Sequence, residues 1–353
     1  MTVVGARPQF VKAAVVSEAL RAAEIDEYLV HTGQHFDANM SDVFFRELGM
    51  RPPDANLGIG GLSQGAMTGR TLEALESLML ERKPEAVLVY GDTNATLAGA
   101  LAASKLGIGV AHVEAGMRSF NRAMPEELNR IVVDHLATHH FVTGQIPQKN
   151  LENEGVVDGV HVVGDVMFDA CKRFLPSAKS TIDVRAYGVG ERPFALVTLH
   201  RAENTNDRET LARLFDGLAE VAKSIDVIMP LHPRTEQKAK TFGIDVPSEV
   251  RTIEPVGYLP MLALLDACKL VITDSGGVQK EAFYLQRPCV TMRNETEWIE
   301  TVAQGYNRLV GSDLGALIEA VKAFASDPVL LPPDPCYGDG DASSKIVTIL
   351  KSS

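Results

Sequence analysis

Three carboxylates stand where they could act together as acids and bases. Asp92 and Glu114 each follow a short apolar run that is typical of a buried strand. A helical stretch joins the two runs, which predicts a right-handed crossover between parallel strands about 4.8 Å apart. Glu126 lies in the first turn of a helix expected to begin at Pro125. Neighbouring carboxylates acquire different pKa values, and enzymes use such groups for acid and base steps at neutral pH, so this pattern indicates proton transfer.

Glu126 also has a simpler interpretation. A glutamate in the first turn complements the helix dipole, and it stands four residues before Arg130, with which it could form an ion pair. The sequence leaves both interpretations open.

A glycine-containing segment, Asp274-Ser-Gly-Gly-Val-Gln-Lys-Glu281, follows another apolar run and opens a helix. Ser275, Gly276 and Gly277 would let backbone N–H groups approach a phosphate at the helix N-terminus. Glu281, one turn further, could accept hydrogen bonds from ribose hydroxyls. The segment is neither a Walker loop nor Gly-x-Gly-x-x-Gly, which weakens ATPase and NAD-dependent interpretations. A plain helix cap is the alternative.

The cations near predicted strand ends contrast with the charge of the whole chain. Its 353 residues carry 34 Lys and Arg against 46 Asp and Glu, a net charge of −12, which argues against general nucleic-acid binding. An acidic protein that gathers cations at strand ends is expected to neutralise a bound anion there. These cations are Arg7, Lys12, His200 and Arg201.

Metal, disulfide and membrane signatures are absent from the sequence. The fragments His112-x-Glu114 and Asp134-His135 lack the spacing of known metal motifs, so we expect no metal, and His112 is expected to be a buried strand residue. The four cysteines are scattered, which suits a reducing compartment. No apolar run approaches the roughly 18 residues that span a bilayer, and no basic-then-apolar leader precedes Gly5. We therefore expect a cytoplasmic protein without membrane insertion.

Alternating apolar runs and helical stretches predict an α/β fold with two doubly wound, Rossmann-like domains. We place the domains at residues 1–165 and 166–339, followed by a last helical segment at 340–353. The expected strands are Thr2–Val4, Tyr28–His31, Ala86–Tyr90, Val110–Val113, His139–Thr143, Val160–Val163, Ala195–Leu199, Val227–Leu231, Leu270–Thr273, Pro288–Met292 and Arg308–Val310.

Motifs along the whole chain resemble those of the non-hydrolysing UDP-N-acetylglucosamine 2-epimerases, and they occur in the family's order. The matching segments are Gly5-Ala-Arg-Pro, Gln34-His35, Gly91-Asp-Thr, His112-Val-Glu-Ala-Gly-Met-Arg118, Pro125-Glu-Glu-Leu-Asn-Arg130, His200-Arg201, Thr273-Asp-Ser-Gly-Gly-Val-Gln279, Arg308-Leu-Val-Gly311 and Tyr337-Gly-Asp-Gly340.

The resemblance implies a GT-B-like pair of domains facing across a cleft that holds a UDP-sugar, a homodimer, and a last helix that returns to the first domain. The implied reaction eliminates UDP to 2-acetamidoglucal and adds it back after reprotonation on the opposite face, interconverting UDP-N-acetylglucosamine and UDP-N-acetylmannosamine without NAD, metal or other cofactor. It would supply precursors of cell-surface polysaccharides. The implied acid/base residues are Asp92, Glu114 and Glu126, assisted by His200. The implied UDP contacts are Arg7, Lys12, Ser275, Gly276, Gly277, Glu281 and Arg308, of which Arg308 rests on the resemblance alone.

Some residues depart from the family pattern. At position 298 the chain has Trp, and in this it resembles the branch of the family that acts on UDP-2,3-diacetamido-2,3-dideoxyglucuronic acid. Lys280 stands where many members have Glu. Gln34-His35-Phe36-Asp37 differs from the motif of members activated by a second UDP-N-acetylglucosamine. A glycosyltransferase on the same scaffold, a hydrolysing epimerase and a non-catalytic UDP-sugar-binding regulator remain alternatives.

Overall fold

The computed structural model describes residues 1–34, 45–326, 330 and 332–352, and the chain divides into two compact units. Unit 1 comprises Met1–Arg173 and Pro335–Ser353, and unit 2 comprises Phe174–Asp334. The chain passes from unit 1 to unit 2 within helix α7 (Val166–Thr181), and α15 (Ala342–Ser352) belongs to unit 1. His35 and the rest of the 35–37 motif lie outside the described residues.

Unit 1 is built around a seven-stranded parallel sheet in the order β3-β2-β1-β4-β5-β6-β7. Besides the first part of α7, its elements are β1 (Thr2–Val4), α1 (Arg7–Ala22), β2 (Leu29–His31), β3 (Ala55–Asn56), α3 (Gln64–Arg82), β4 (Ala86–Tyr90), α4 (Asn94–Lys105), β5 (Gly109–Val113), α5 (Pro125–Leu136), β6 (His139–Val142), α6 (Gln145–Asn153), β7 (Val160–Val162) and α15 (Ala342–Ser352).

Unit 2 is built around a six-stranded parallel sheet in the order β10-β9-β8-β11-β12-β13. Besides the end of α7, its elements are the 3₁₀ helix η1 (Val184–Tyr187), β8 (Phe194–Thr198), α8 (Ala202–Thr205), α9 (Arg208–Ala222), β9 (Asp226–Pro230), α10 (Pro233–Phe242), β10 (Val250–Ile253), α11 (Tyr258–Ala267), β11 (Leu270–Thr273), α12 (Gly276–Tyr284), β12 (Cys289–Thr291), α13 (Ile299–Ala303), β13 (Asn307–Leu309) and α14 (Leu314–Ala325).

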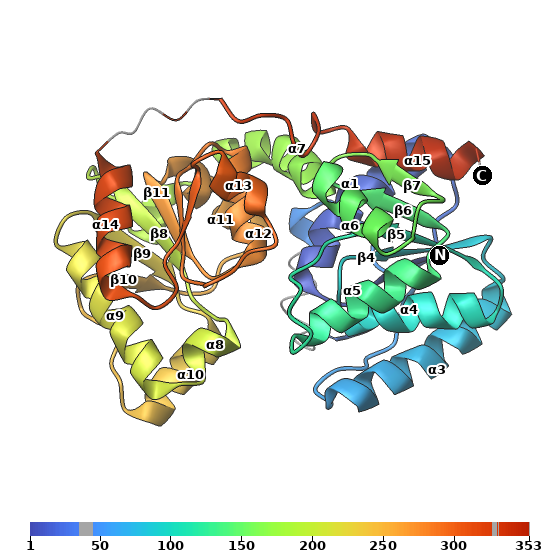
Figure 1. Cartoon of the computed structure of the whole chain (residues 1–353), viewed down its shortest axis with the longest axis horizontal. Coiled ribbons are helices and arrows are strands. Elements are labelled where there is room, and N and C mark those ends of the chain that lie inside the picture. The colour runs from blue at the N-terminus through green and yellow to red at the C-terminus, as the bar shows by residue number, and fades with distance from the viewer. Residues whose placement is uncertain (35–44, 327–329, 331, 353) are drawn as a thin grey trace. The chain divides into compact units, whose positions relative to one another are not determined.

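Helices cover both faces of each sheet, because strands buried on both sides need two apolar layers. In unit 2, alternate residues of β8 and β11 pack against α9 and α14 on one face and against α11 and α12 on the other. In unit 1, α3, α4 and α5 pack on one face, and α15 lies beside α1 on the opposite side (Figure 1). The prediction of two doubly wound α/β domains is therefore confirmed.

The strand orders place a topological switch point in each unit, where consecutive connections run to opposite sides of the sheet. In unit 1 the switch lies between β1 and β4, and in unit 2 it lies between β8 and β11. Ligands of doubly wound folds bind beside the carboxyl ends of the strands at such points. The loops that follow these four strands are accordingly the first places to look for a site.

Candidate functional site

The loop after β1 brings a buried lysine to the carboxyl edge of the unit 1 sheet. Gly5 permits this tight turn, because a Cβ there would lie 2.3 Å from Thr32 Oγ1. Helix α1 then begins at Arg7, which is half-buried, and it carries Lys12 on its inner face. Lys12 Nζ lies 2.7 Å from Glu114 Oε1, and both side chains are largely buried. The structure therefore joins two of the predicted site residues in one ion pair.

Glu114 is held in an unusual backbone conformation directly after β5. Its φ is +69°, in the left-handed region that a non-glycine residue adopts at a cost of about 1–2 kcal/mol. The N–H groups of Glu114 and Ala115 both donate to the carbonyl of Phe141 on β6, at 3.0 and 3.2 Å. Strained backbone of this kind persists where the surrounding structure fixes it, and it is concentrated at functional sites.

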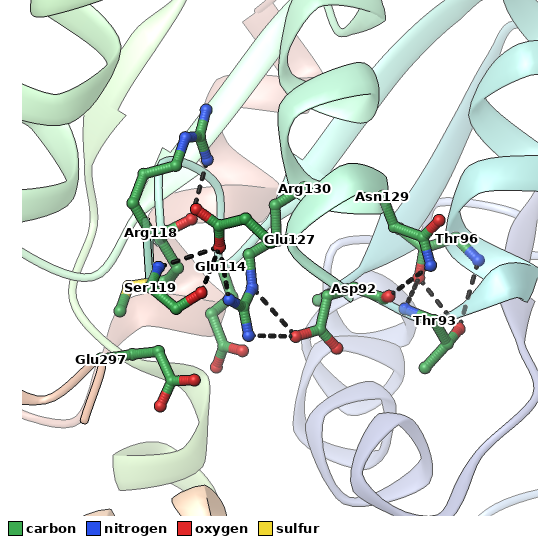
Figure 2. Close-up of polar contacts among 12 residues, drawn as sticks. Asp92, Thr93, Thr96, Glu114, Arg118, Ser119, Glu127, Asn129, Arg130 and Glu297 are labelled. Atoms are coloured by element: carbon green, nitrogen blue, oxygen red, sulfur yellow. Dashed lines mark hydrogen bonds and ion pairs between the residues drawn. The ribbon is translucent and has the colours of Figure 1, made fainter. Parts of the chain in front are cut away.

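Asp92, in the loop after β4, is held by helix α5. Arg130 donates to Asp92 Oδ2 through Nε at 3.0 Å and Nη2 at 2.6 Å, and Asn129 Nδ2 donates to the Asp92 carbonyl at 2.8 Å. Figure 2 shows the Arg130 guanidinium between the carboxylates of Asp92 and Glu127. The Asp92 side chain remains 29% exposed, so its position is fixed while its carboxylate stays accessible.

Glu127 is the buried anchor of this arrangement. It is 1% exposed and accepts hydrogen bonds from the Ser119 backbone and hydroxyl at 2.9 Å, from the Phe120 N–H at 2.8 Å and from Arg130 Nη1 at 2.9 Å. Burial raises the pKa of Glu127, but these hydrogen bonds together outweigh burial and hold that pKa below its ordinary value. Glu127 is therefore an ionised structural group.

Glu126, the neighbouring residue on α5, has a different environment. It is half-buried in the first helical turn and makes no hydrogen bond or ion pair with the rest of the described chain. Arg130 pairs with Glu127, three residues away, and with Asp92. The contacts among the described residues thus join Asp92 to Arg130 and Glu114 to Lys12, without including Glu126.

Replacing Glu127 with Gln is expected to lower the free energy of unfolding by about 2 kcal/mol, because a neutral amide cannot satisfy all four donors in a buried site. Since the folded-state pKa lies below the ordinary value of 4.5, this stabilisation is complete above pH 4.5 and is lost as the pH falls through the folded value. Urea denaturation at pH 7 and below pH 4 measures both effects. Glu126→Gln is the matched control, and its free energy of unfolding is expected to stay within about 0.5 kcal/mol of wild type. Equal losses of unfolding free energy in the two variants would contradict the structural role of Glu127.

The switch point of unit 2 centres on a buried aspartate. Asp274 is fully buried. Its Oδ2 accepts from the N–H groups of His200 and Arg201 at 2.9 and 2.8 Å and from Asn204 Nδ2 at 3.1 Å. Its Oδ1 lies 3.2 Å from His200 Nδ1. Burial raises the pKa of Asp274, but its contacts with His200 and Arg201 outweigh burial and keep it below its ordinary value. The carboxylate fixes the orientation of the His200 ring, which remains 34% exposed.

Ser275, Gly276 and Gly277 form the start of α12, directly after Asp274. A Cβ at Gly276 would lie 3.3 Å from Trp298 Nε1 and 3.9 Å from an Arg201 guanidinium nitrogen, so these two side chains flank the helix N-terminus. At Gly277, the nearest atom to a Cβ would be Ser275 Oγ, at 4.0 Å. Exposed backbone donors, a helix dipole and a nearby cation are the features of an anion site.

The remaining predicted UDP contacts lie in different surroundings. Glu281 is buried one turn into α12. Arg308 lies on β13 with its guanidinium 4.9 Å from the ring centroid of Phe324 on α14. No described contact brings Arg308 to the α12 N-terminus.

Several residues that organise the site were not assigned a role from the sequence. The sequence suggests Glu126 as the partner of Arg130, and nothing local indicates that the arginine instead pairs with Glu127 and reaches Asp92. Asp274 stood at the end of an apolar run, and a carboxylate after a buried strand is the signal that could have identified it. Among the described residues, no group of three His, Cys, Asp or Glu side chains could hold a metal ion, and no helix is long and apolar enough to cross a membrane.

Comparison with known proteins identifies the family. The family model described as UDP-N-acetylglucosamine 2-epimerase matches residues 18–351. The chain is 47% identical to the UDP-2,3-diacetamido-2,3-dideoxy-D-glucuronate 2-epimerase of Pseudomonas aeruginosa, covering 99% of this chain and 98% of the relative. It is 41% identical to the UDP-N-acetylglucosamine 2-epimerase of Methanocaldococcus jannaschii, covering 99% and 97%.

Solved structures agree with these matches. The crystal structure of the Methanocaldococcus jannaschii enzyme in complex with UDP-GlcNAc and UDP superposes with a TM-score of 0.94 at 40% identity, covering 100% of this chain and 99% of that chain. The Neisseria meningitidis enzyme bound to UDP-GlcNAc gives a TM-score of 0.89 at 31% identity, with the same coverage. This chain therefore belongs to the UDP-N-acetylglucosamine 2-epimerase family, a family of isomerases, as the resemblance of its motifs predicted.

Proposed function

We propose that this protein interconverts UDP-N-acetylglucosamine and UDP-N-acetylmannosamine without net hydrolysis. The observation that carries the proposal is the pair of organised carboxylates in unit 1, where Asp92 is fixed by Arg130 and Glu114 by Lys12. A reaction that removes and returns a proton at carbon 2 needs such groups, and relatives with 41% identity are named for it.

The proposed reaction has two balanced halves. A carboxylate of the set Asp92, Glu114 and Glu126 takes the proton from carbon 2 while the bond between carbon 1 and the phosphate oxygen breaks, leaving 2-acetamidoglucal and UDP. A carboxylic acid of the same set then protonates carbon 2 on the opposite face, and the phosphate oxygen of UDP adds back to carbon 1. No atom is gained or lost, and no redox cofactor takes part.

In unit 2, the proposed role of the α12 N-terminus is to bind the diphosphate of UDP. The Ser275 N–H already donates to Thr273 Oγ1 at 2.9 Å, so the N–H groups of Gly276 and Gly277, with the Ser275 hydroxyl, would hold phosphate oxygens. His200, oriented by Asp274, would stabilise the charge that develops as UDP leaves. Arg7 and Lys12 add positive charge in unit 1. Glu281 and Arg308 are proposed UDP contacts, and for Arg308 the motif is the support.

A second candidate substrate is UDP-2,3-diacetamido-2,3-dideoxyglucuronic acid. The 47% identity to the Pseudomonas aeruginosa enzyme favours it, and so does the tryptophan motif at Trp298. Lys280 Nζ lies 4.0 Å from the centroid of the Trp298 ring. The two substrates differ at two positions of the sugar: the diacetamido substrate carries an acetamido group in place of the hydroxyl at carbon 3 and a carboxylate in place of the hydroxymethyl group at carbon 5.

Incubation of the protein with each sugar nucleotide in deuterated water tests the proposal. The expected result is deuterium at carbon 2 of one substrate together with its 2-epimer, and the faster substrate identifies the specificity. Absence of deuterium from both sugars would refute the epimerase proposal. UDP release that requires an added acceptor would instead indicate a glycosyltransferase, and free N-acetylmannosamine a hydrolysing epimerase.

We also propose a homodimer formed through the outer surface of α3 and α5. Leu80 on α3 and Leu128 and Val132 on α5 are 59%, 45% and 41% exposed, and the last two lie one turn apart. Joint replacement of Leu128 and Val132 with Asp is expected to convert a dimer into a monomer, because charges would be buried at the interface. Light scattering reports the mass. Leu314→Asp, at a 39% exposed position of unit 2, is the control, and a monomeric wild-type protein would contradict the proposal.

A further inference from the structure

We propose that His112 and Asp134 form a buried, charged clamp that positions the two loops carrying Asp92 and Glu114. These two residues touch no reacting atom, so they are positioning residues. The inference rests on the proposed function of those carboxylates, but the charge state of the clamp can be tested separately.

The clamp connects β5, α5 and the loop after β4. His112 on β5 and Asp134 on α5 both have fully buried side chains. His112 Nδ1 lies 2.7 Å from Asp134 Oδ1, and His112 Nε2 lies 2.8 Å from the carbonyl oxygen of Gly91. Gly91 immediately precedes Asp92, so the imidazole joins the backbone of the Asp92 loop to α5.

The other carboxylate oxygen of Asp134 holds the second loop. Asp134 Oδ2 accepts from the Gly116 N–H at 3.0 Å and from Arg118 Nη1 at 2.7 Å. Gly116 lies two residues after Glu114, whose backbone is in the left-handed region. One carboxylate therefore fixes the strained turn at Glu114 and, through His112, the turn at Asp92.

Counting donors and acceptors gives the charge of the imidazole. The Gly91 carbonyl can only accept, so His112 Nε2 must donate. Asp134 already accepts from Gly116 and Arg118, and as an ionised carboxylate it can only accept from Nδ1 as well. Both ring nitrogens of His112 therefore carry protons, and the ring is an imidazolium buried against a carboxylate.

The surroundings balance these charges. Arg118, which is 1% exposed at its side chain, pairs with Asp134 and also with Glu154 at 2.7 Å, so two cations face two carboxylates. His140 on β6, the register partner of His112, bonds the Asp134 carbonyl through Nε2 at 2.7 Å. Burial raises the pKa of Asp134, but His112 and Arg118 outweigh burial and keep that pKa below its ordinary value, which agrees with an ionised carboxylate.

The test compares His112→Gln with His140→Gln. Both substitutions remove a buried imidazole next to Asp134, but only the first breaks the link to Gly91 and to the Asp134 carboxylate. Turnover is measured as deuterium exchange at carbon 2 of the faster sugar nucleotide, and UDP affinity by calorimetry. Urea denaturation of each variant shows the conditions in which it is fully folded.

For His112→Gln we expect kcat to fall about 100-fold, the effect of misplacing a reacting group by about 1 Å, with UDP affinity within twofold of wild type. For His140→Gln we expect kcat within threefold of wild type. In ¹⁵N-histidine-labelled wild-type protein at pH 7.5, the resonances that disappear in His112→Gln are expected to show two protonated ring nitrogens.

Equal kcat for the two folded variants, or a neutral His112 ring, would overturn the clamp. Failure of the proposed function gives a different result: wild-type protein then shows no deuterium exchange with either sugar. The nitrogen resonances still report the charge of His112 in that case.

Discussion

Turnover of the Asp92→Asn variant is expected to fall about 1,000-fold, within the range that positioned acid–base groups contribute. The amide neither takes nor delivers a proton at neutral pH, yet it has nearly the shape of the carboxylate, and its oxygen can still accept from Arg130. UDP affinity is expected to change less than twofold, because Asp92 is not among the proposed UDP contacts. Deuterium exchange and calorimetry with UDP measure the two quantities.

Asp158→Asn is the matched control for this variant. Asp158 is an exposed aspartate of the same unit, and no hydrogen bond or ion pair with another described residue holds its side chain. Its turnover is expected to stay at the wild-type level. Normal exchange by folded Asp92→Asn protein would show that Asp92 is not an acid or base of the reaction.

The Asp274→Asn substitution is expected to weaken both folding and UDP binding. It lowers the free energy of unfolding by about 3 kcal/mol, because an uncharged amide faces the donors of His200, Arg201 and Asn204 in a fully buried position. It also releases the His200 ring and the turn before α12, so UDP affinity is expected to fall at least tenfold, or by about 1.4 kcal/mol. Urea denaturation and calorimetry measure these losses.

The acid dependence of stability provides a second readout for Asp274. Its folded-state pKa lies below the ordinary value of 3.8, so its stabilisation is complete above pH 3.8 and disappears as the pH falls through the folded value. The difference in free energy of unfolding between wild type and Asp274→Asn is therefore expected to become smaller as the pH falls below 3.8. Asp216→Asn, at an exposed position of α9, is the control. If folded Asp274→Asn protein bound UDP as tightly as wild type, the proposal that Asp274 organises the diphosphate site through His200 would be contradicted.

The strands that the sequence did not reveal are both at sheet edges. All of the expected strands are present within one residue of their predicted bounds, but β3 and β10 were not predicted. The two residues of β3 and the sequence Val-Arg-Thr-Ile of β10 are partly exposed, since an edge strand has no neighbour on one side. Without burial on both faces, no continuous apolar run marks such a strand.

The positions of the site residues were more predictable than their pairing. A polar residue after a buried strand identifies the carboxyl edge of the sheet, which is how Asp92, Glu114 and His200 were found. Pairing depends on which loops meet across the sheet and on helix rotation, so the distant partner of Arg130 could not be read from local spacing. The donor count around His112 likewise requires coordinates, because its two partners are 21 and 22 residues away.

The contribution of α15 to unit 1 has a consequence for synthesis on the ribosome. The N–H groups of Ala342 and Ser343 donate to Asp169 at 3.1 and 2.7 Å, and the helix that follows packs against α1. Translation delivers every residue of unit 2 by position 334, whereas unit 1 still lacks one of its helices at that moment. Unit 1 is therefore completed only after residues 342–352 have been synthesised, and until then the surface of α1 that α15 covers stays exposed.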